Sequence, residues 1–214
     1  MKNIFKIAVV LGIVFLNSSC KKWLTEENFV RIGSDVIYKD EGGLSVGLGA
    51  LYNLQRAYEL MSYNNGLQQN NLWVYCADDL GCTRTFNDAQ VYKANMNAIN
   101  FPRGKWNSGY QLIDRASAII SAAPNVTFAS AANRNRVIAE AKVLRAMAYW
   151  HLISFFGDVP FFTRPPANQQ ELFEFTRTDK KVIIDFLIKD LESVVNDLDW
   201  NPTQAGRVSK GVAK

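Results

Sequence analysis

The feature that most constrains the fold is a long alanine-rich segment of helical period between residues 132 and 156. Its apolar residues recur every three or four positions and so share one helix face: Val137, Ala141, Leu144, Ala148, Leu152 and Phe155. Small side chains in the same segment allow a second helix to approach closely: Ala139, Ala141, Ala146 and Ala148. Gly157 is a typical residue at a helix end. The segment predicts an all-α protein built from packed helix pairs.

Further segments share this helical period. Residues 44–61 and 106–123 predict helices before the alanine-rich segment, and Pro124 closes the second of them. Residues 179–199 predict a helix after it, with Thr178 as the N-cap. The chain therefore supplies several amphipathic helices that can pack together.

The remaining stretches lack regular period. Residues 62–105 are polar with scattered aromatic residues and predict long loops, which are usually functional when a compact domain keeps them. Residues 158–178 contain several prolines and predict an extended crossing segment rather than a helix. A further helix is expected after Ser209 but has less than one turn of sequence, so we expect a truncated chain.

The first residues predict an export signal. Residues 1–19 combine two lysines with the short apolar run 7–16 and small residues, and Cys20 follows. We expect cleavage before Cys20, lipid attachment to this cysteine, a tether over residues 20–40 and a folded body over 41–214. Leu16 lies four residues before the cysteine rather than three. An ordinary secretory signal with a chance cysteine is the alternative.

The other cysteines, Cys76 and Cys82, are close enough to pair in an exported protein. Two buried thiols are the alternative. Neither belongs to a metal or redox motif, and the single histidine, His151, argues against a histidine-rich metal centre. We expect no metal and no cofactor, and we expect His151 to be a scaffold residue.

The composition indicates a globular protein, with 48% hydrophobic and 21% charged residues. The net charge of +4 is spread along the chain without a basic block. Nucleic acid is therefore not an expected partner.

Several segments resemble the SusD/RagB family. The signature helix and turn match in the run 139–146 (AEAKVLRA), Tyr149, Leu152 and the turn 156–160 (FGDVP). Further segments follow in the family's order: Leu51-Tyr52-Asn53, Asp78-Asp79, Trp106 to Arg115, Asp190-Leu191-Glu192 and Gly206-Arg207. The resemblance covers nearly all of residues 20–214.

The resemblance implies an all-α protein with tetratricopeptide-type helix pairs and long ligand-bearing loops, of which this chain holds the N-terminal part. It implies a non-enzymatic lipoprotein at the outer-membrane surface that binds a glycan or a peptide. A SusC-like TonB-dependent transporter is the implied partner. Lys21-Lys22 stand where the family usually has acidic residues, which leaves the periplasmic and the external face both open.

Sugar recognition needs flat aromatic faces together with planar hydrogen-bonding groups. The stretch from residue 78 to 106 offers both kinds of side chain, and the resemblance points to the same loop. The candidate ligand-binding residues are Asp79, Arg84, Phe86, Tyr92, Asn97 and Trp106. For Trp106 a core position is the alternative, because its spacing to Tyr110 and Ile113 puts it on the apolar helix face.

Other functions find less support in the sequence. A glycoside hydrolase needs two carboxyl groups that flank one bond, and the adjacent side chains of Asp78 and Asp79 diverge if the backbone is extended. No GxSxG, P-loop, HExxH or GxGxxG motif occurs in the chain. A helical-repeat adaptor that binds another protein through the aromatic residues of 62–106 remains the main alternative.

Overall fold

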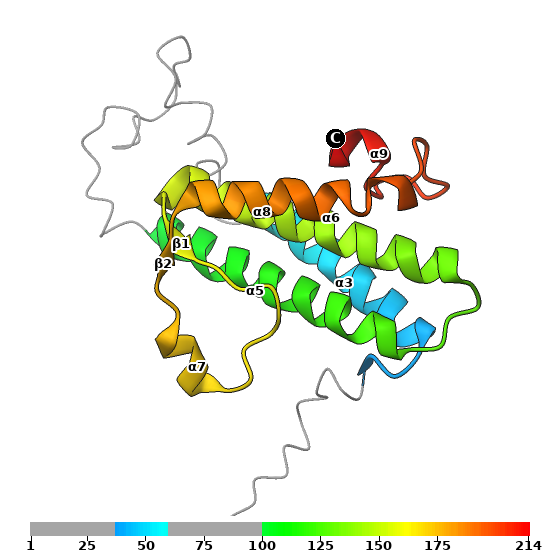
Figure 1. Ribbon diagram of the computed structural model, residues 1–214, viewed down its shortest axis with the longest axis horizontal. Coiled ribbons are helices and arrows are strands. Elements are labelled where there is room, and N and C mark those ends of the chain that lie inside the picture. Colours follow the sequence, from blue (N-terminus) through cyan, green and yellow to red (C-terminus); the bar gives the residue numbers. More distant parts are fainter. Residues whose placement is uncertain (1–36, 60–99) are drawn as a thin grey trace, which may run out of the picture. The chain divides into compact units, whose positions relative to one another are not determined.

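The computed structural model describes residues 37–59 and 100–214. Long helices dominate this part (Figure 1): α3 (Glu41–Glu59), α5 (Asn100–Ala122), α6 (Ala131–Phe156) and α8 (Lys180–Glu192). Shorter elements connect or follow them: η2 (Ala123–Asn125), β1 (Val159–Pro160), α7 (Gln169–Glu174), β2 (Arg177–Thr178), η3 (Val195–Asp197) and α9 (Lys210–Ala213). The all-α prediction is confirmed.

The core lies where α3, α5 and α6 pack against one another. The predicted apolar face of α3 is buried through Leu44, Leu48, Leu51 and Tyr58. Helix α5 approaches α6 at Gly109, where an added Cβ atom would lie 3.0 Å from Cδ2 of Leu152. A Cβ atom at this position would force the Leu152 side chain to shift by a few tenths of an ångström in a closely packed interface.

Helix α6 has well-defined ends. The hydroxyl of Ser130 accepts a hydrogen bond from the backbone N–H of Asn133 at 3.1 Å and caps the N-terminus. At the other end Gly157 adopts a φ of 70° and its N–H donates to the carbonyl of Ile153. Glycine suits this left-handed position because it has no Cβ.

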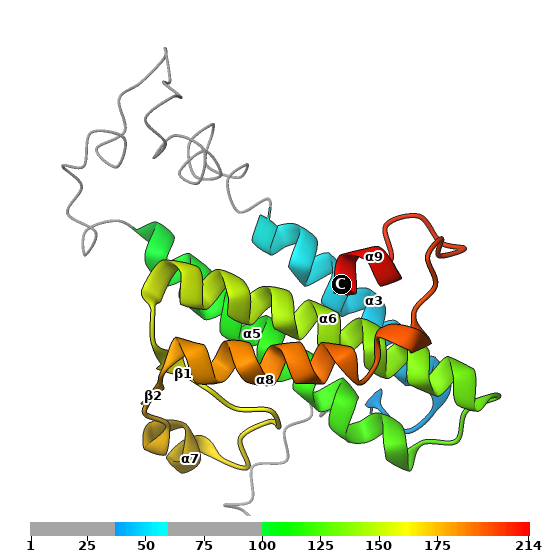
Figure 2. The same ribbon diagram turned by 45° about the horizontal axis from the view of Figure 1, so that its top comes forward.

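Helix α8 packs on α6 (Figure 2) through Ile183 and Leu187. The N-cap is Asp179, whose carboxylate accepts from the N–H of Lys181, so the prediction of Thr178 was wrong. Thr178 instead pairs in β2. The helix also ends earlier than predicted, at Glu192, and η3 follows.

The segment between α6 and α8 is only partly extended. Val159 and Pro160 of β1 pair antiparallel with Thr178 and Arg177 of β2, which closes the segment into a loop. Helix α7 lies within it, so the prediction that 158–178 contains no helix was wrong. Asn168 supplies the reason, because its side chain accepts from the N–H of Glu171 and caps this short helix.

Helix α5 begins at Asn100, six residues before the predicted start at Trp106. Pro102 falls in its first turn, where the missing N–H of proline breaks no helical hydrogen bond. The predicted signal 1–19, the lipidation site Cys20, most of the tether 20–40 and the pair Cys76 and Cys82 lie outside the described residues. Among the residues described, no helix is both long and apolar enough to cross a membrane.

Candidate functional site

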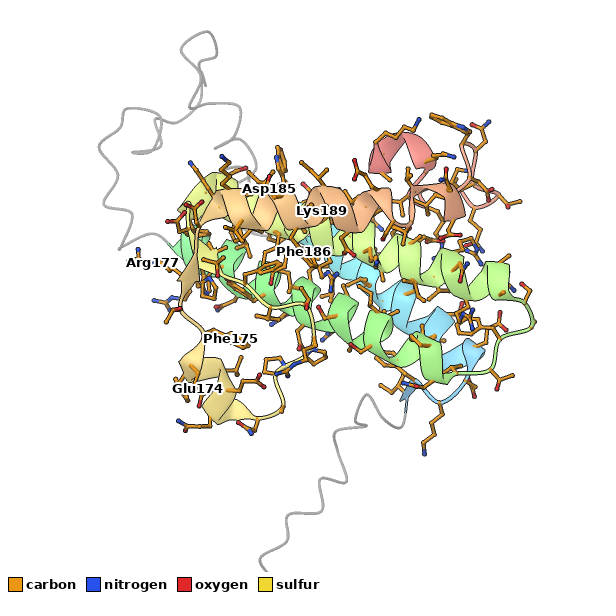
Figure 3. The ribbon with its side chains drawn as sticks, viewed as in Figure 1. Glu174, Phe175, Arg177, Asp185, Phe186 and Lys189 are labelled. Carbon is orange, nitrogen blue, oxygen red and sulfur yellow. The ribbon has the colours of Figure 1, made fainter. Side chains whose placement is uncertain are left out.

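A cleft of about 620 Å³ separates α5 from the segment that runs from Pro160 to Phe175. Four aromatic side chains line the cleft and form what we call its aromatic wall. Helix α5 supplies Trp106 and Tyr110, and the opposite segment supplies Phe162 and Phe175. Phe175 follows α7 directly (Figure 3), so the loop between β1 and β2 carries one half of the wall. We call this site the aromatic cleft.

The aromatic rings contact one another in sequence along the wall. The ring centroids of Trp106 and Tyr110 lie 4.9 Å apart, and Tyr110 stacks on Phe162 at 5.8 Å. Phe162 in turn stacks on Phe175 at 5.2 Å. Trp106 also packs edge-on against Phe156 at 5.1 Å. This packing fixes the orientation of the rings, so the apolar lining of the cleft is formed before any ligand binds.

Tyr110 is held by its hydroxyl as well as by its ring. The hydroxyl donates to the carbonyl of Pro160 at 2.8 Å. Burial raises the pKa of the phenol, which keeps Tyr110 a neutral donor at ordinary pH. The residue thereby ties α5 to the start of the opposite wall.

A row of polar side chains on α5 borders the cleft beside these rings. Asn107, Gln111 and Asp114 follow one another at spacings of four and three residues, which places them on one helix face. Within residues 37–59 and 100–214, none of their side chains makes a hydrogen bond to the protein. The surrounding apolar groups raise the pKa of Asp114, and nearby Arg115 partly opposes this.

The position of Phe162 is set by Tyr149 on α6. The Tyr149 hydroxyl donates to the carbonyl of Phe162 at 2.7 Å and accepts from its N–H at 2.9 Å. Both backbone groups of Phe162 are thus bonded to one side chain. The aromatic wall is therefore anchored to the helical core rather than carried by a free loop.

A buried ion-pair cluster anchors the next residue, Thr163. Arg145 of α6, with a side chain only 3% exposed, donates to the Thr163 carbonyl at 2.8 Å and to Asp190 of α8 at 2.7 Å. Lys142 lies 2.7 Å from the other oxygen of Asp190. These bonds join α6, α8 and the cleft segment.

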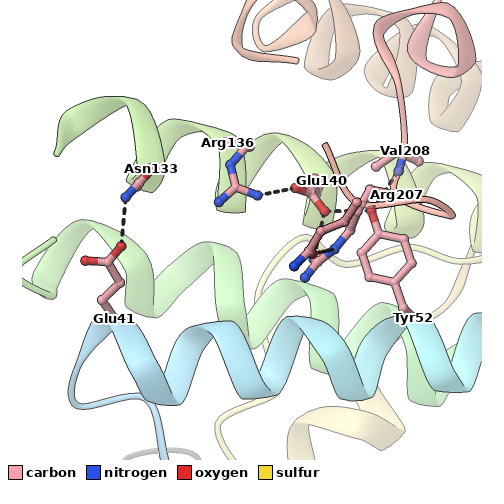
Figure 4. Close-up of polar contacts among 8 residues, drawn as sticks. Glu41, Tyr52, Asn133, Arg136, Glu140, Arg207 and Val208 are labelled. Carbon is pink, nitrogen blue, oxygen red and sulfur yellow. Dashed lines mark hydrogen bonds and ion pairs between the residues drawn. The ribbon is translucent and has the colours of Figure 1, made fainter. Parts of the chain in front are cut away.

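A second pocket, of about 490 Å³, lies on the α3 side of α6 and is also lined by residues 198–208. Its centre is Glu140, with a side chain 3% exposed (Figure 4). One carboxylate oxygen accepts from Arg136 at 2.9 Å, and the other accepts from Tyr52 at 2.6 Å and Arg207 at 3.0 Å. The Tyr52 hydroxyl accepts from the N–H of Val208 at 2.9 Å. We call this site the Glu140 pocket.

The histidine is part of the helical scaffold, as expected. His151 is buried on α6, with Nε2 3.0 Å from Oε1 of Glu59 at the end of α3. Its ring lies edge-on to Tyr58 with centroids 5.4 Å apart. The hydrogen bond from His151 lowers the pKa of Glu59. Among the residues described, no group of three His, Cys, Asp or Glu side chains is arranged to hold a metal ion.

A family model matches residues 49–204 of the chain. It is SusD-like and is described as starch-binding and associating with the outer membrane. The matched segment covers well over half of the chain. The chain belongs to the SusD-like family.

Curated SusD-like relatives match over nearly the whole chain. SusD-like protein P25 of Formosa agariphila is 24% identical over 99% of this chain, and SusD-like protein P38 of the same organism is 25% identical over 92%. The chain spans 41% and 38% of the lengths of these relatives. The SusD-like chain is thus similar to part of longer proteins.

Solved SusD-like structures share the fold. A laminarin-binding SusD-like protein is 26% identical, with a TM-score of 0.66 over 82% of this chain and 38% of its own. Surface glycan-binding protein A of Bacteroides uniformis is 22% identical, with a TM-score of 0.64 over 79% of this chain and 39% of its own. The recognition of the SusD family from the sequence motifs is confirmed.

The structure places one of the sequence-predicted ligand residues of this SusD-like chain. Trp106 lines the aromatic cleft and also packs on Phe156. Its role in ligand binding stays a prediction. The other candidates lie outside the described residues: Asp79, Arg84, Phe86, Tyr92 and Asn97.

The sequence did not single out the rest of the cleft. Asn107, Gln111 and Asp114 share a helical period that could have been read as a polar stripe next to Trp106. Phe162 and Phe175 carry no such signal, because they lie in an irregular, proline-containing segment. Their proximity to Trp106 follows only from the folding of that segment onto α5.

Proposed function

We propose that this SusD-like protein binds a glycan without altering it and delivers it to a TonB-dependent outer-membrane transporter. The observation that carries the proposal is the aromatic cleft, where packed aromatic rings lie beside polar side chains that make no hydrogen bond within the described residues. A pyranose ring has an apolar face and an equatorial belt of hydroxyl groups. The two kinds of surface in the cleft suit these two sides of a sugar.

Binding needs little rearrangement of the cleft. The ring of Phe162 is held through its backbone by Tyr149, and Tyr110 is held by Pro160. Asn107 and Gln111 can donate and accept hydrogen bonds, and their side chains are exposed in the unliganded protein. A preformed surface reduces the entropy lost on binding, so weak individual contacts can add up to specific capture.

The carboxyl groups of the cleft favour binding over hydrolysis. Asp114 is the one carboxylate among the cleft-lining residues in the described part of the chain. A glycosidase normally uses two carboxyl groups about 5–10 Å apart, one as acid and the other as nucleophile or base. We therefore assign the cleft to recognition, with no catalytic step.

The transporter and the location are proposed from the family. The family model is described as associating with the outer membrane, and the export signal 1–19, followed directly by Cys20, fits a lipid anchor. Labelling cells with a radioactive fatty acid tests the lipid anchor at Cys20. The wild-type protein should carry label, and Cys20→Ala should not.

A titration of the chain with soluble starch and laminarin tests glycan binding, by calorimetry and tryptophan fluorescence together. We expect saturable heat, a fluorescence change and no release of reducing ends. Trp106→Phe should remove most of the fluorescence change, whereas Trp200→Phe, at a site 59% exposed and away from the cleft, should keep it. Absence of binding to these and to a wider set of glycans would contradict the proposal, and reducing-end release would favour an enzyme.

A further inference from the structure

The aromatic cleft carries charge of one sign. Asp114 is the charged side chain among its described lining residues, and neither Lys nor Arg is among them. The neighbouring Arg164 forms an ion pair with Glu171. Arg115 follows Asp114 on α5 and favours its charged form electrostatically, but its side chain does not line the cleft. A ligand in this part of the cleft therefore meets a carboxylate that no lining cation neutralises.

Asp114 differs from its two neighbours in the polar row in the hydrogen bonds that it can form. Asn107, Gln111 and Asp114 span about 10 Å of helix, which is longer than one sugar ring. Amide groups both donate and accept, but an ionised carboxylate only accepts. Hydroxyl groups of a sugar can donate to Asp114 and form charge-assisted hydrogen bonds. The carboxylate of a uronic acid can only accept, and it repels Asp114 as a like charge.

From this arrangement we infer that the aromatic cleft selects uncharged glycans and rejects uronic-acid chains, with Asp114 as the residue that enforces the choice. The inference rests on the proposed glycan binding and names its substrate class. The rings set no such preference, because the apolar faces of glucose and glucuronate are alike. The discrimination comes from the polar row and is electrostatic.

The size of the effect follows from the separation of the charges. Two unit charges about 7 Å apart at an effective dielectric constant of about 40–80 change a binding constant roughly three- to sevenfold. The effect should weaken as salt is added, since the screening length falls from about 10 Å at 0.1 M to about 3 Å at 1 M. Selectivity that depends on shape alone would not respond to salt.

The test compares each neutral polysaccharide with its own charged form. Soluble starch and laminarin, and the same two polymers oxidised at C6 to uronates, are titrated into the chain at low and high salt. We expect the neutral form of the better ligand to bind roughly three- to sevenfold more tightly at low salt. Asp114→Asn, which keeps the shape of the side chain and removes its charge, should bring the ratio close to one.

The control removes the same charge elsewhere. Asp185 is exposed on α8 (Figure 3) and does not line the cleft, so Asp185→Asn should leave the ratio unchanged. Equal binding of neutral and oxidised polymers, or an unchanged ratio in Asp114→Asn, would overturn the inference while glycan binding stands. Failure of every form, and of a wider set of glycans, to bind would overturn the proposed function and the inference with it.

Discussion

The Glu140 pocket beside α6 and the aromatic cleft beside α5 differ in the hydrogen bonding of their polar groups. In the Glu140 pocket both carboxylate oxygens of the central residue are bonded to Arg136, Tyr52 and Arg207. In the aromatic cleft the polar row of Asn107, Gln111 and Asp114 has no side-chain partner within the described residues. The central carboxylate of the first pocket is bonded to protein groups, whereas the polar row of the second can still form hydrogen bonds to a ligand.

The comparison separates structural from recognition roles by physical criteria. A buried carboxylate with saturated hydrogen bonds contributes to stability and offers a ligand little. Solvated amides beside partly buried aromatic rings contribute little to stability but can gain bonds on binding. Substitutions in the two pockets should therefore affect different measurements.

The largest effect is expected for Glu140→Ala. It leaves Arg136, Arg207 and Tyr52 without their shared acceptor, and loss of one partner of a buried charge pair costs about 3 kcal/mol. Urea unfolding followed by helical circular dichroism should show the loss, whereas glycan affinity of the folded protein should be unchanged. Glu140→Gln, which keeps one acceptor oxygen, should lose less. Reduced affinity in the folded variant would contradict the division of roles.

The next largest effect is expected for Tyr149→Phe, which should lower both the free energy of unfolding and the affinity for glycan. The hydroxyl bonds both backbone groups of Phe162, so its removal should cost about 2 kcal/mol of unfolding free energy. It should also weaken glycan binding severalfold, because the aromatic wall loses its anchor.

Tyr52→Phe is the matched control for this prediction. Its hydroxyl also makes two hydrogen bonds, to Glu140 and to Val208, but it serves the Glu140 pocket. It should lower stability by a similar amount and leave affinity unchanged. Equal affinities in both variants would mean that Tyr149 does not position the cleft.

The parts of the fold that could be predicted from the sequence are the helices whose apolar residues recur at a regular spacing. The buried faces of α3 and α6 follow from apolar residues that recur every three or four positions, and they match the observed core. The aromatic cleft could not be derived this way. Phe162 gains its place from Tyr149 and Phe175 from the capped helix α7, and both depend on contacts between segments without period.

The Glu140 pocket shows the same limit. The pair Arg136 and Glu140 is readable as an i, i+4 contact on a helix. Tyr52 and Arg207 lie 88 and 67 positions from Glu140 in the sequence. No local sequence pattern predicts their hydrogen bonds to it. The SusD-like motif around residues 139–146 identified the family without revealing that Glu140 is buried.

A smaller effect, on binding alone, is expected for the double variant Asn107→Ala/Gln111→Ala. Each amide can form one or two bonds to a sugar, so glycan affinity should fall roughly tenfold, or about 1.4 kcal/mol. Unfolding free energy should stay within about 0.5 kcal/mol, since both side chains are exposed. Asn53→Ala, on the exposed side of α3, is the control and should change neither. Unaltered affinity in the double variant would remove the polar row from the site.

The smallest effect concerns the pH dependence of stability at Asp114. Desolvation raises the pKa of this carboxyl in the folded protein, so the folded state prefers the protonated form more than the unfolded state does. The charge therefore destabilises the protein above the folded pKa, and the penalty disappears as the pH falls below the unfolded value of about 3.9. Because the side chain is exposed, we expect Asp114→Asn to be more stable than wild type by a few tenths of a kcal/mol at pH 7.

At about pH 3 the two melting temperatures should coincide, because the carboxyl is then protonated in both states. Asp185→Asn at the same two pH values controls for the general loss of one negative charge. A variant less stable than wild type at pH 7 would mean that Asp114 is paired within the protein. The polar row would then resemble the Glu140 pocket, and the contrast between a satisfied and an open site would no longer hold at that residue.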